Sequence, residues 1–143
     1  MSSGPTFEWW SVDRVLIHEQ YNREKVEELA AKIRQSGVCR DPLWIDRETG
    51  VLLDGHHRFA ALRLLGAVRV PVWAFEYEDD AVITLERWNP GPAIAKSEVV
   101  RRAREGRPFP PKTTRHVIHV TLPSHPTALS EVLGPVPADA ATG

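Results

Sequence analysis

Residues 52–73 read LLDGHHRFAALRLLGAVRVPVW, and this stretch joins a strand, a helix and a second strand. Apolar residues at helical spacing predict a helix after the polar turn 54–58, and Gly66 ends it. Its buried stripe is expected to comprise Phe59, Leu62 and Leu65. Residues 68–77 alternate as a strand does, and Pro71 predicts an edge position or a bulge. The polar turn therefore lies where a strand runs into the start of a helix.

The rest of the chain mixes helical patterns with short apolar or alternating runs. Asn22 is a good N-cap, the apolar residues after it recur at helical spacing, and Gly37 follows the last of them. Expected helices span 23–36 and 93–105, and expected strands span 12–17, 42–46, 51–53, 81–88 and 116–122, with a short helix as the alternative over 81–88. This order predicts an α+β fold with a small mixed sheet and flanking helices.

The length of 143 residues suits one domain, which we expect to cover residues 1–123. After Pro123 the chain is rich in Ala, Pro and small polar residues. Residues 124–143 are therefore expected to form a C-terminal tail that is partly disordered.

The composition argues against several classes of protein. A formal net charge of −1 gives no global field that would draw the chain to DNA or membranes. The start MSSGPTFEWW lacks the basic and apolar regions of a signal peptide, and no run of about 18 apolar residues follows. A single cysteine, Cys39, allows no internal disulfide. The sequence therefore predicts a cytoplasmic protein without a membrane segment.

The turn Asp54-Gly55-His56-His57-Arg58 is the first candidate site. A helix N-terminus presents free backbone N–H groups and the positive end of the helix dipole, which together favour phosphate. Gly55 would let the backbone approach a ligand closely, and Arg58 matches phosphate in a bidentate way. His56 and His57 add further hydrogen-bond donors. The turn therefore predicts a nucleotide-phosphate site.

Asp54 is the one acid of this turn. It could hold a magnesium ion, because magnesium prefers carboxylate and phosphate oxygens. In the structural alternative, His56 and His57 cap or pack the helix and Asp54 is its N-cap. A zinc site fits less well, because adjacent histidines on a helix point in different directions and no cysteine pair completes a ligand set.

Two further stretches and one tryptophan are candidates. Residues 110–116, PPKTTRH, place hydroxyls and cations after rigid prolines, which suits a phosphate or an amino-acid carboxylate; a basic surface loop is the alternative. Glu19 lies between a predicted strand and a predicted helix, where it is either a general base or a solvated loop residue. Trp88 precedes the loop 89–92 and either walls a substrate pocket or packs in the core.

Taken together, these residues resemble a known family. The stretch 52–73 is similar to the signature of ParB/sulfiredoxin-fold proteins, and its Asp-Gly-His-His-Arg form resembles the free L-serine kinases of that superfamily, from a siderophore pathway and from archaea. Those kinases also carry a motif of the PPKTTRH type, a glutamate after the first strand and a tryptophan. Here these correspond to 110–116, Glu19 and Trp88, so the resemblance spans about residues 12–120.

The resemblance implies a kinase that transfers a phosphoryl group from ATP or ADP to the hydroxyl of free L-serine, giving O-phospho-L-serine. In this scheme the turn 54–58 holds the nucleotide phosphates, Asp54 places magnesium and Glu19 takes the proton of the serine hydroxyl. The residues that would bind the substrate are Trp88, Lys112, Thr113, Thr114, Arg115 and His116. The chain is shorter than many members of the family, and the resemblance leaves the donor, the hydroxylated acceptor and the oligomeric state, monomer or dimer, open.

Two other functions of the same superfamily remain as alternatives. A ParB-like module would bind nucleotide and DNA, with the basic face of the helix 93–105 on the phosphates. No convincing helix-turn-helix follows the core, which argues against a nucleic-acid partner. A sulfiredoxin-like reductase would need Cys39 in the phosphate turn, and Cys39 lies elsewhere in the sequence.

Overall fold

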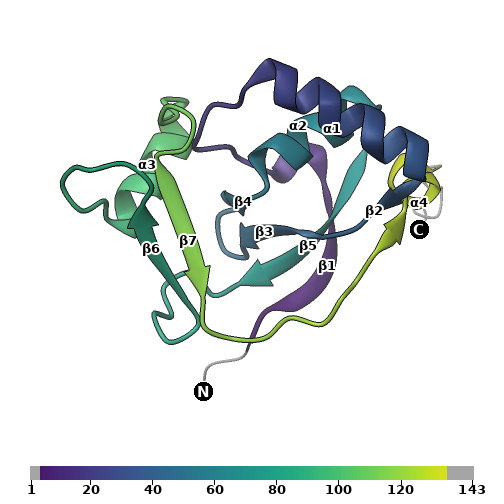
Figure 1. Cartoon of the computed structure of the whole chain (residues 1–143). Helices are drawn as coiled ribbons and strands as arrows, with labels where there is room; N and C mark the ends of the chain where they lie inside the picture. Colours follow the sequence, from purple (N-terminus) through teal and green to yellow (C-terminus); the bar gives the residue numbers. More distant parts are fainter. Residues whose placement is uncertain (1–3, 135–143) are drawn as a thin grey trace.

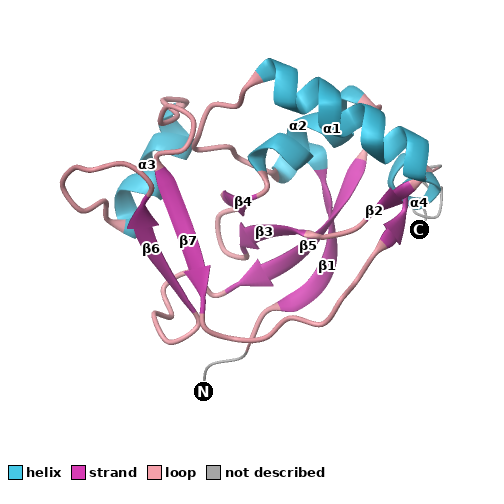
Figure 2. Ribbon diagram, in the orientation of Figure 1, coloured by secondary structure: helices cyan, strands magenta, loops and turns pink. Residues whose placement is uncertain are grey.

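A four-stranded mixed sheet lies at the centre of the structure, a computed structural model that describes residues 4–134. Its strands are β1 (Thr6–Ser11), β3 (Leu43–Asp46), β4 (Leu52–Asp54) and β5 (Arg69–Phe75), in the spatial order β1-β5-β3-β4. β5 runs antiparallel to β1 and parallel to β3, and β3 runs antiparallel to β4 (Figure 2). The expected α+β fold with a small mixed sheet is confirmed.

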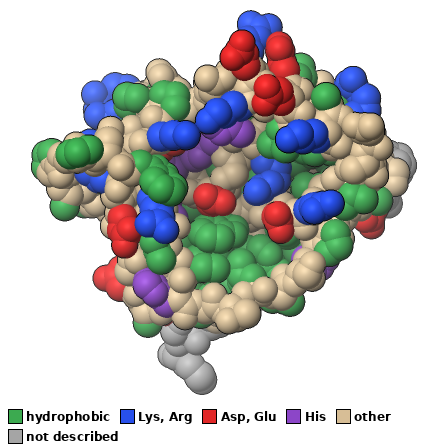
Figure 3. Space-filling view, viewed as in Figure 1, with side chains coloured by type: hydrophobic (Ala, Val, Ile, Leu, Met, Phe, Trp, Pro, Cys, Tyr) green, Lys and Arg blue, Asp and Glu red, His purple; other side chains and the backbone are tan. Residues whose placement is uncertain are grey.

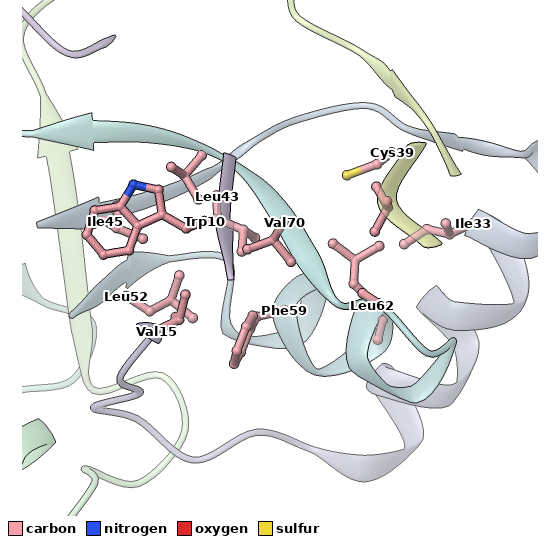
Figure 4. Close-up of a cluster of buried hydrophobic side chains, with 14 of the residues drawn as sticks. Trp10, Val15, Ile33, Cys39, Leu43, Ile45, Leu52, Phe59, Leu62 and Val70 are labelled. Atoms are coloured by element: carbon pink, nitrogen blue, oxygen red, sulfur yellow. The ribbon is translucent and has the colours of Figure 1, made fainter. Parts of the chain in front are cut away.

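Two helices cover one face of this sheet (Figure 1). α1 (Arg23–Ser36) begins after Asn22, whose side-chain oxygen accepts the Lys25 N–H at 3.1 Å, and it ends at Gly37, which has a φ of 73°. α2 (His56–Leu64) begins two residues after the end of β4. Figure 4 shows the core that the helices and the sheet enclose, which includes Trp10, Val15, Ile45, Phe59, Leu62 and Val70. The helix expected over 23–36 is confirmed with both of its ends.

Cys39 lies in the same core and is only 1% exposed (Figure 4). Burial in apolar surroundings raises the pKa of its thiol. A nucleophilic cysteine needs the opposite, an accessible side chain with a lowered pKa. Cys39 is therefore a packing residue, and the sulfiredoxin-like alternative finds no support in its surroundings.

The C-terminal segment corrects the expected tail. β2 (Val38–Cys39) pairs with β8 (Thr127–Ala128), and α4 (Leu129–Leu133) follows with Val132 fully buried in the first core. Residues 127–133 of the expected tail therefore pack against the first core, and the domain boundary at residue 123 stays a prediction. A two-residue strand and a five-residue helix are too short to produce a periodic pattern, so tertiary packing defines them. Residues 135–143 of the expected tail lie outside the described residues.

A second hydrophobic cluster lies beside the first. β6 (Ile83–Arg87) and β7 (Thr114–Ile118) form an antiparallel pair, and α3 (Lys96–Glu105) connects them in sequence (Figure 1). They pack with the end of β5 around Phe75, Ile83, Val99 and Phe109. Among residues 4–134, no helix is long and apolar enough to cross a membrane.

Two expectations near the N-terminal half are wrong. Residues 12–14 form a short 3-10 helix, η1 (Val12–Arg14), rather than the start of a strand, because the Ser11 hydroxyl caps it by accepting the Asp13 N–H. Pro71 lies in β5 between two neighbouring strands, not at a sheet edge. The pairing of β5 with β3 begins at Val72, one residue after Pro71. The N–H that proline lacks is therefore not needed for that pairing.

Candidate functional site

A cavity of about 380 Å³ opens between α1, the start of α2 and the segment that leads into β7. Most residues that the sequence singles out line it: Glu19, Trp88, Lys112, Thr114 and all five residues of the turn 54–58. Figure 3 views this hollowed face, where Lys and Arg side chains border His side chains. Stretches far apart in the sequence therefore meet at one site.

The turn between β4 and α2 has an open helix N-terminus. Gly55 occupies the N-cap position with a φ of 100°, and no side chain caps the helix. A Cβ at this position would lie 2.8 Å from both Arg58 Nη1 and Leu43 Cδ2, so the turn requires glycine for its conformation and for space. The first N–H groups of an α-helix have no partner within the helix. This geometry suits a phosphate group at the floor of the cavity.

Asp54 adds a carboxylate at the edge of this turn. Desolvation raises the pKa of Asp54, and the nearby Arg58 guanidinium opposes that rise. Among residues 4–134, no group of three or more His, Cys, Asp and Glu side chains is arranged to hold a metal ion. A magnesium ion here would therefore take Asp54 as its protein ligand and complete its shell with phosphate oxygens and water, which is a common arrangement for magnesium.

The two histidines of the turn accept hydrogen bonds from the preceding loop. His56 Nε2 accepts the His18 N–H at 3.2 Å, and His57 Nε2 accepts the Asn22 N–H at 2.9 Å. Desolvation lowers the pKa of both imidazoles. Both rings are therefore neutral at neutral pH and fix the 18–22 loop on α2. The role predicted for these histidines in binding phosphate stays a prediction, and both side chains line the cavity.

Glu19 ties the 18–20 segment to the start of β7. Its Oε2 accepts the Lys112 N–H at 2.9 Å, and its Oε1 accepts both the N–H and the hydroxyl of Thr114, at 3.0 and 2.7 Å. Backbone bonds between this segment and Phe109 hold the two stretches side by side. Lys112 adopts a φ of 58°, which aims its N–H at the carboxylate. Glu19 is thus a fixed acceptor at the cavity wall.

Two lysines meet at the mouth of the cavity. Lys25 in the first turn of α1 and Lys112 both line it, and the proximity of Lys112 lowers the pKa of Lys25. Two cations this close repel each other unless an anion lies between them. Sequence reasoning missed Lys25, although a signal existed: a lysine in the first turn of a helix opposes the helix dipole.

Three of the residues predicted to bind the substrate, Thr113, Arg115 and His116, do not line the cavity. The Thr113 hydroxyl donates to the Pro110 carbonyl at 2.7 Å, and buried His116 places Nε2 2.7 Å from the Tyr77 hydroxyl. Arg115 lies on the outer face, where it contacts Glu86 and stacks over the Trp88 ring at 4.9 Å. β7 begins at Thr114, so Arg115 projects to the face opposite Thr114, whereas His116 shares the face of Thr114 and is buried against Tyr77. The strand expected from residue 116 starts two residues earlier.

His18 is a second residue that sequence reasoning missed. It is fully buried behind the cavity wall, with Nδ1 2.7 Å from the Leu52 carbonyl and Nε2 2.9 Å from the Thr114 hydroxyl. Burial lowers its pKa to about 4. It precedes Glu19 directly, so its position beside that carboxylate was the one available signal.

Comparisons with known proteins agree with the resemblance. The chain is 36% identical over 83 residues to an ATP-dependent L-serine kinase of Staphylothermus marinus, covering 55% of this chain and 32% of the relative. It is 31% identical over 98 residues to the ADP-dependent L-serine kinase SerK of Thermococcus kodakarensis, covering 66% and 40%. A ParB-like protein of Sulfolobus acidocaldarius is 32% identical over 82 residues, covering 57% and 40%. No family model matches the chain.

These matches span about a third to two fifths of the length of the curated relatives. Solved structures match most of the fold. A free serine kinase in complex with AMP superimposes with a TM-score of 0.75 at 18% identity, over 92% of this chain and 95% of the other. The truncated SbnI of Staphylococcus aureus gives a TM-score of 0.64 at 15% identity, over 78% and 82%. The ParB/sulfiredoxin-like fold that the sequence predicts is confirmed.

Proposed function

We propose that this chain is a nucleotide-dependent kinase of free L-serine that forms O-phospho-L-serine. The observation that carries the proposal is the convergence, on one cavity, of an uncapped helix N-terminus, cationic side chains and a fixed carboxylate. The helix N-terminus would bind the phosphates of the donor, the cations would offset their negative charge, and the carboxylate would accept the proton of the hydroxyl acceptor. The serine kinases named among the relatives support the choice of substrate.

The nucleotide phosphates would lie on the turn 54–58. Backbone N–H groups of the first turn of α2 would donate to phosphate oxygens, with Gly55 allowing the close approach. Because His56 and His57 are neutral, the positive charge would come from Arg58, Lys25 and Lys112. Phosphoryl transfer depends mainly on such positioning and electrostatic stabilisation.

Magnesium fits this arrangement through Asp54. The carboxylate lines the cavity beside the open helix N-terminus, where phosphate oxygens would complete the coordination. The ion, when bound, would neutralise charge on the phosphates. Both ATP-dependent and ADP-dependent kinases are among the relatives, and we propose no preference between the two donors.

The serine hydroxyl would approach Glu19. A carboxylate has about four acceptor positions, and donors from residues 112–114 take three of them. The remaining position would accept the hydroxyl proton, so Glu19 is proposed as the general base. Trp88, 59% exposed at the cavity mouth, would cover the bound substrate. Thr113, Arg115 and His116 would act by shaping β7 rather than by touching serine.

The DNA-binding alternative gains no support from α3. Lys96 is bound to Asp80 at 2.7 Å, and Arg102 lies 3.5 Å from Glu98 with its guanidinium over the Phe109 ring. Lys96 and Arg102 therefore have intramolecular partners, whereas Arg101 and Arg104 are exposed. A basic helix that reads phosphates would leave Lys96 and Arg102 open to the ligand as well.

An end-point assay tests the proposal. Purified protein, magnesium and L-serine are incubated with ATP and, separately, with ADP, and O-phosphoserine is measured by mass spectrometry. Product is expected with at least one donor and is expected to disappear in Glu19→Gln and Asp54→Asn. Glu105→Gln, at an exposed glutamate paired with Arg107, is the matched control and should retain activity. Absence of product with both donors from folded, nucleotide-binding protein would reject the proposal.

A further inference from the structure

Four groups form a continuous hydrogen-bonded chain from the protein interior to Glu19. The chain runs from the Leu52 carbonyl to His18 Nδ1 at 2.7 Å, from His18 Nε2 to the Thr114 hydroxyl at 2.9 Å, and from that hydroxyl to Glu19 Oε1 at 2.7 Å. His18 and Thr114 are both buried, so solvent does not compete for these bonds. The proposed phosphoryl transfer uses Glu19 alone and gives the hydrogen bonds of His18 and Thr114 no role.

The protons of the chain can be assigned from its geometry. A carbonyl oxygen only accepts, so His18 carries its proton on Nδ1 and donates it to Leu52. Because burial lowers the pKa of His18 to about 4, its Nε2 holds a lone pair at neutral pH. The Thr114 hydroxyl then faces two acceptors, His18 Nε2 and Glu19 Oε1, with a single hydrogen. It can satisfy only one of them at a time.

The preferred acceptor depends on the charge of Glu19. While Glu19 is ionised, the charge-assisted bond to its carboxylate is the stronger one, and the hydroxyl points to Oε1. Once Glu19 has taken a proton, its Oε1 becomes a weaker acceptor than an imidazole nitrogen, and the hydroxyl turns to His18. The bond to His18 therefore forms only after proton transfer.

We propose that His18 is a positioning residue that captures the Thr114 hydroxyl as Glu19 accepts the substrate proton. The inference rests on the proposed role of Glu19. In the transfer, the serine O–H bond breaks and its proton goes to Glu19, while the serine oxygen bonds to phosphorus and the nucleotide leaves with the electrons of the old P–O bond. Because the His18 bond is made on the product side of proton transfer, it stabilises the transition state more than the bound substrate.

The surroundings of His18 keep it an acceptor. The His56 ring from α2 lies 4.6 Å away and the His116 ring from β7 lies 5.7 Å away, each edge-on, and Phe109 packs at 6.4 Å. Burial lowers the pKa of His56 and of His116, the latter to about 3. His56 and His116 are therefore neutral, and His116 bonds to Tyr77. Glu19 is a charged group beside His18.

Variants of His18 separate this role from simple packing. His18→Asn keeps a donor for the Leu52 carbonyl and removes the acceptor at the Nε2 position. We expect kcat to fall about tenfold with little change in KM, the signature of an interaction made in the transition state. His18→Gln reaches the Nε2 position with an amide oxygen and should recover part of the loss. Nucleotide affinity, measured for AMP, should stay the same in both variants. A wild-type kcat in His18→Asn would overturn the proposal.

A second measurement works without turnover and so separates this proposal from the proposed function. The imidazole nitrogens of His18 are observed by NMR in ¹⁵N-labelled protein at neutral pH. We expect the proton on Nδ1, and we expect the Nε2 resonance to move toward the hydrogen-bonded position in Glu19→Gln, which removes the carboxylate charge. In the Thr114→Val background that shift should vanish. A proton on Nε2, an imidazolium ring, or an Nε2 resonance indifferent to Glu19→Gln would each overturn the proposal.

Discussion

The turn 54–58 and the stretch 112–116 reach the same cavity in different ways. All five residues of the turn line it, whereas only Lys112 and Thr114 of the second stretch do. The turn leads into a helix, whose first N–H groups and side chains converge on one point. The second stretch enters a strand, whose side chains alternate between two faces. The motif at the helix start thus places all of its residues at the cavity, whereas the motif at the strand start places only some of them there.

The largest effect is expected at Gly55. Gly55→Ala would force a side chain into a φ of 100° and within 2.8 Å of Arg58 Nη1 and Leu43 Cδ2. We expect nucleotide binding to be lost and stability to fall by more than the roughly 1–3 kcal/mol of a strained backbone alone. Calorimetric titration with AMP or ADP and urea unfolding measure the two effects.

Gly66→Ala is the matched control for that substitution. Gly66 has a similar φ of 98°, but a Cβ there meets nothing within 4 Å. It should cost only the backbone strain and leave nucleotide binding unchanged. Equal loss of binding in both variants would show that the turn at Gly55 has no special part in holding the ligand.

The second prediction concerns pH, because His18 and His116 are buried with their rings 5.7 Å apart. Burial lowers the pKa of His18 to about 4 and of His116 to about 3. In the unfolded chain a histidine binds its proton near pH 6.5. Their stabilising contribution is therefore complete above about pH 6.5 and is lost as the pH falls toward 4, by about 1.4 kcal/mol per pH unit for each histidine.

Urea unfolding at pH values from 7.5 to 5 measures this slope. His116→Gln, which keeps a polar partner for Tyr77, should make the dependence less steep. His119→Gln changes an exposed histidine of the same region that bonds to Thr84, and it should leave the slope as it is. Unfolding free energies that do not change over this range would contradict the buried, neutral state of His18 and His116.

The smallest effects compare Lys112, which lines the cavity, with Arg115, which stacks over the outer Trp88 ring. Lys112→Asn removes a cation from the cavity mouth and keeps the backbone N–H that Glu19 accepts; asparagine also tolerates the φ of 58°. We expect the KM for the nucleotide to rise about tenfold. Arg115→Ala removes a cation from the opposite face and should change the same KM by less than about twofold. Steady-state kinetics compare the two, and a larger effect at Arg115 would reverse the assignment of faces.

Local signals explain what the sequence could predict. The Asn22 cap and Gly37 mark both ends of α1, and the turn at Gly55 follows from residues within one short segment. Lys25 and His18 escaped prediction because their roles depend on contacts with residues about 90 positions away along the chain, Lys112 and Thr114. The packing of Val132 escaped for the same reason, since a single apolar side chain in a short helix gives no periodic signal.

The measurement that tests the central claim most directly is single-turnover transfer to L-serine labelled with ¹⁸O in its hydroxyl group. The protein is held in excess over the nucleotide, and wild type is compared with Glu19→Gln by mass spectrometry. We predict O-phosphoserine that retains the label, and a rate in Glu19→Gln at least about a hundredfold lower at unchanged nucleotide affinity. Unlabelled or absent product from nucleotide-bound wild type, or equal rates in the two proteins, would contradict the account.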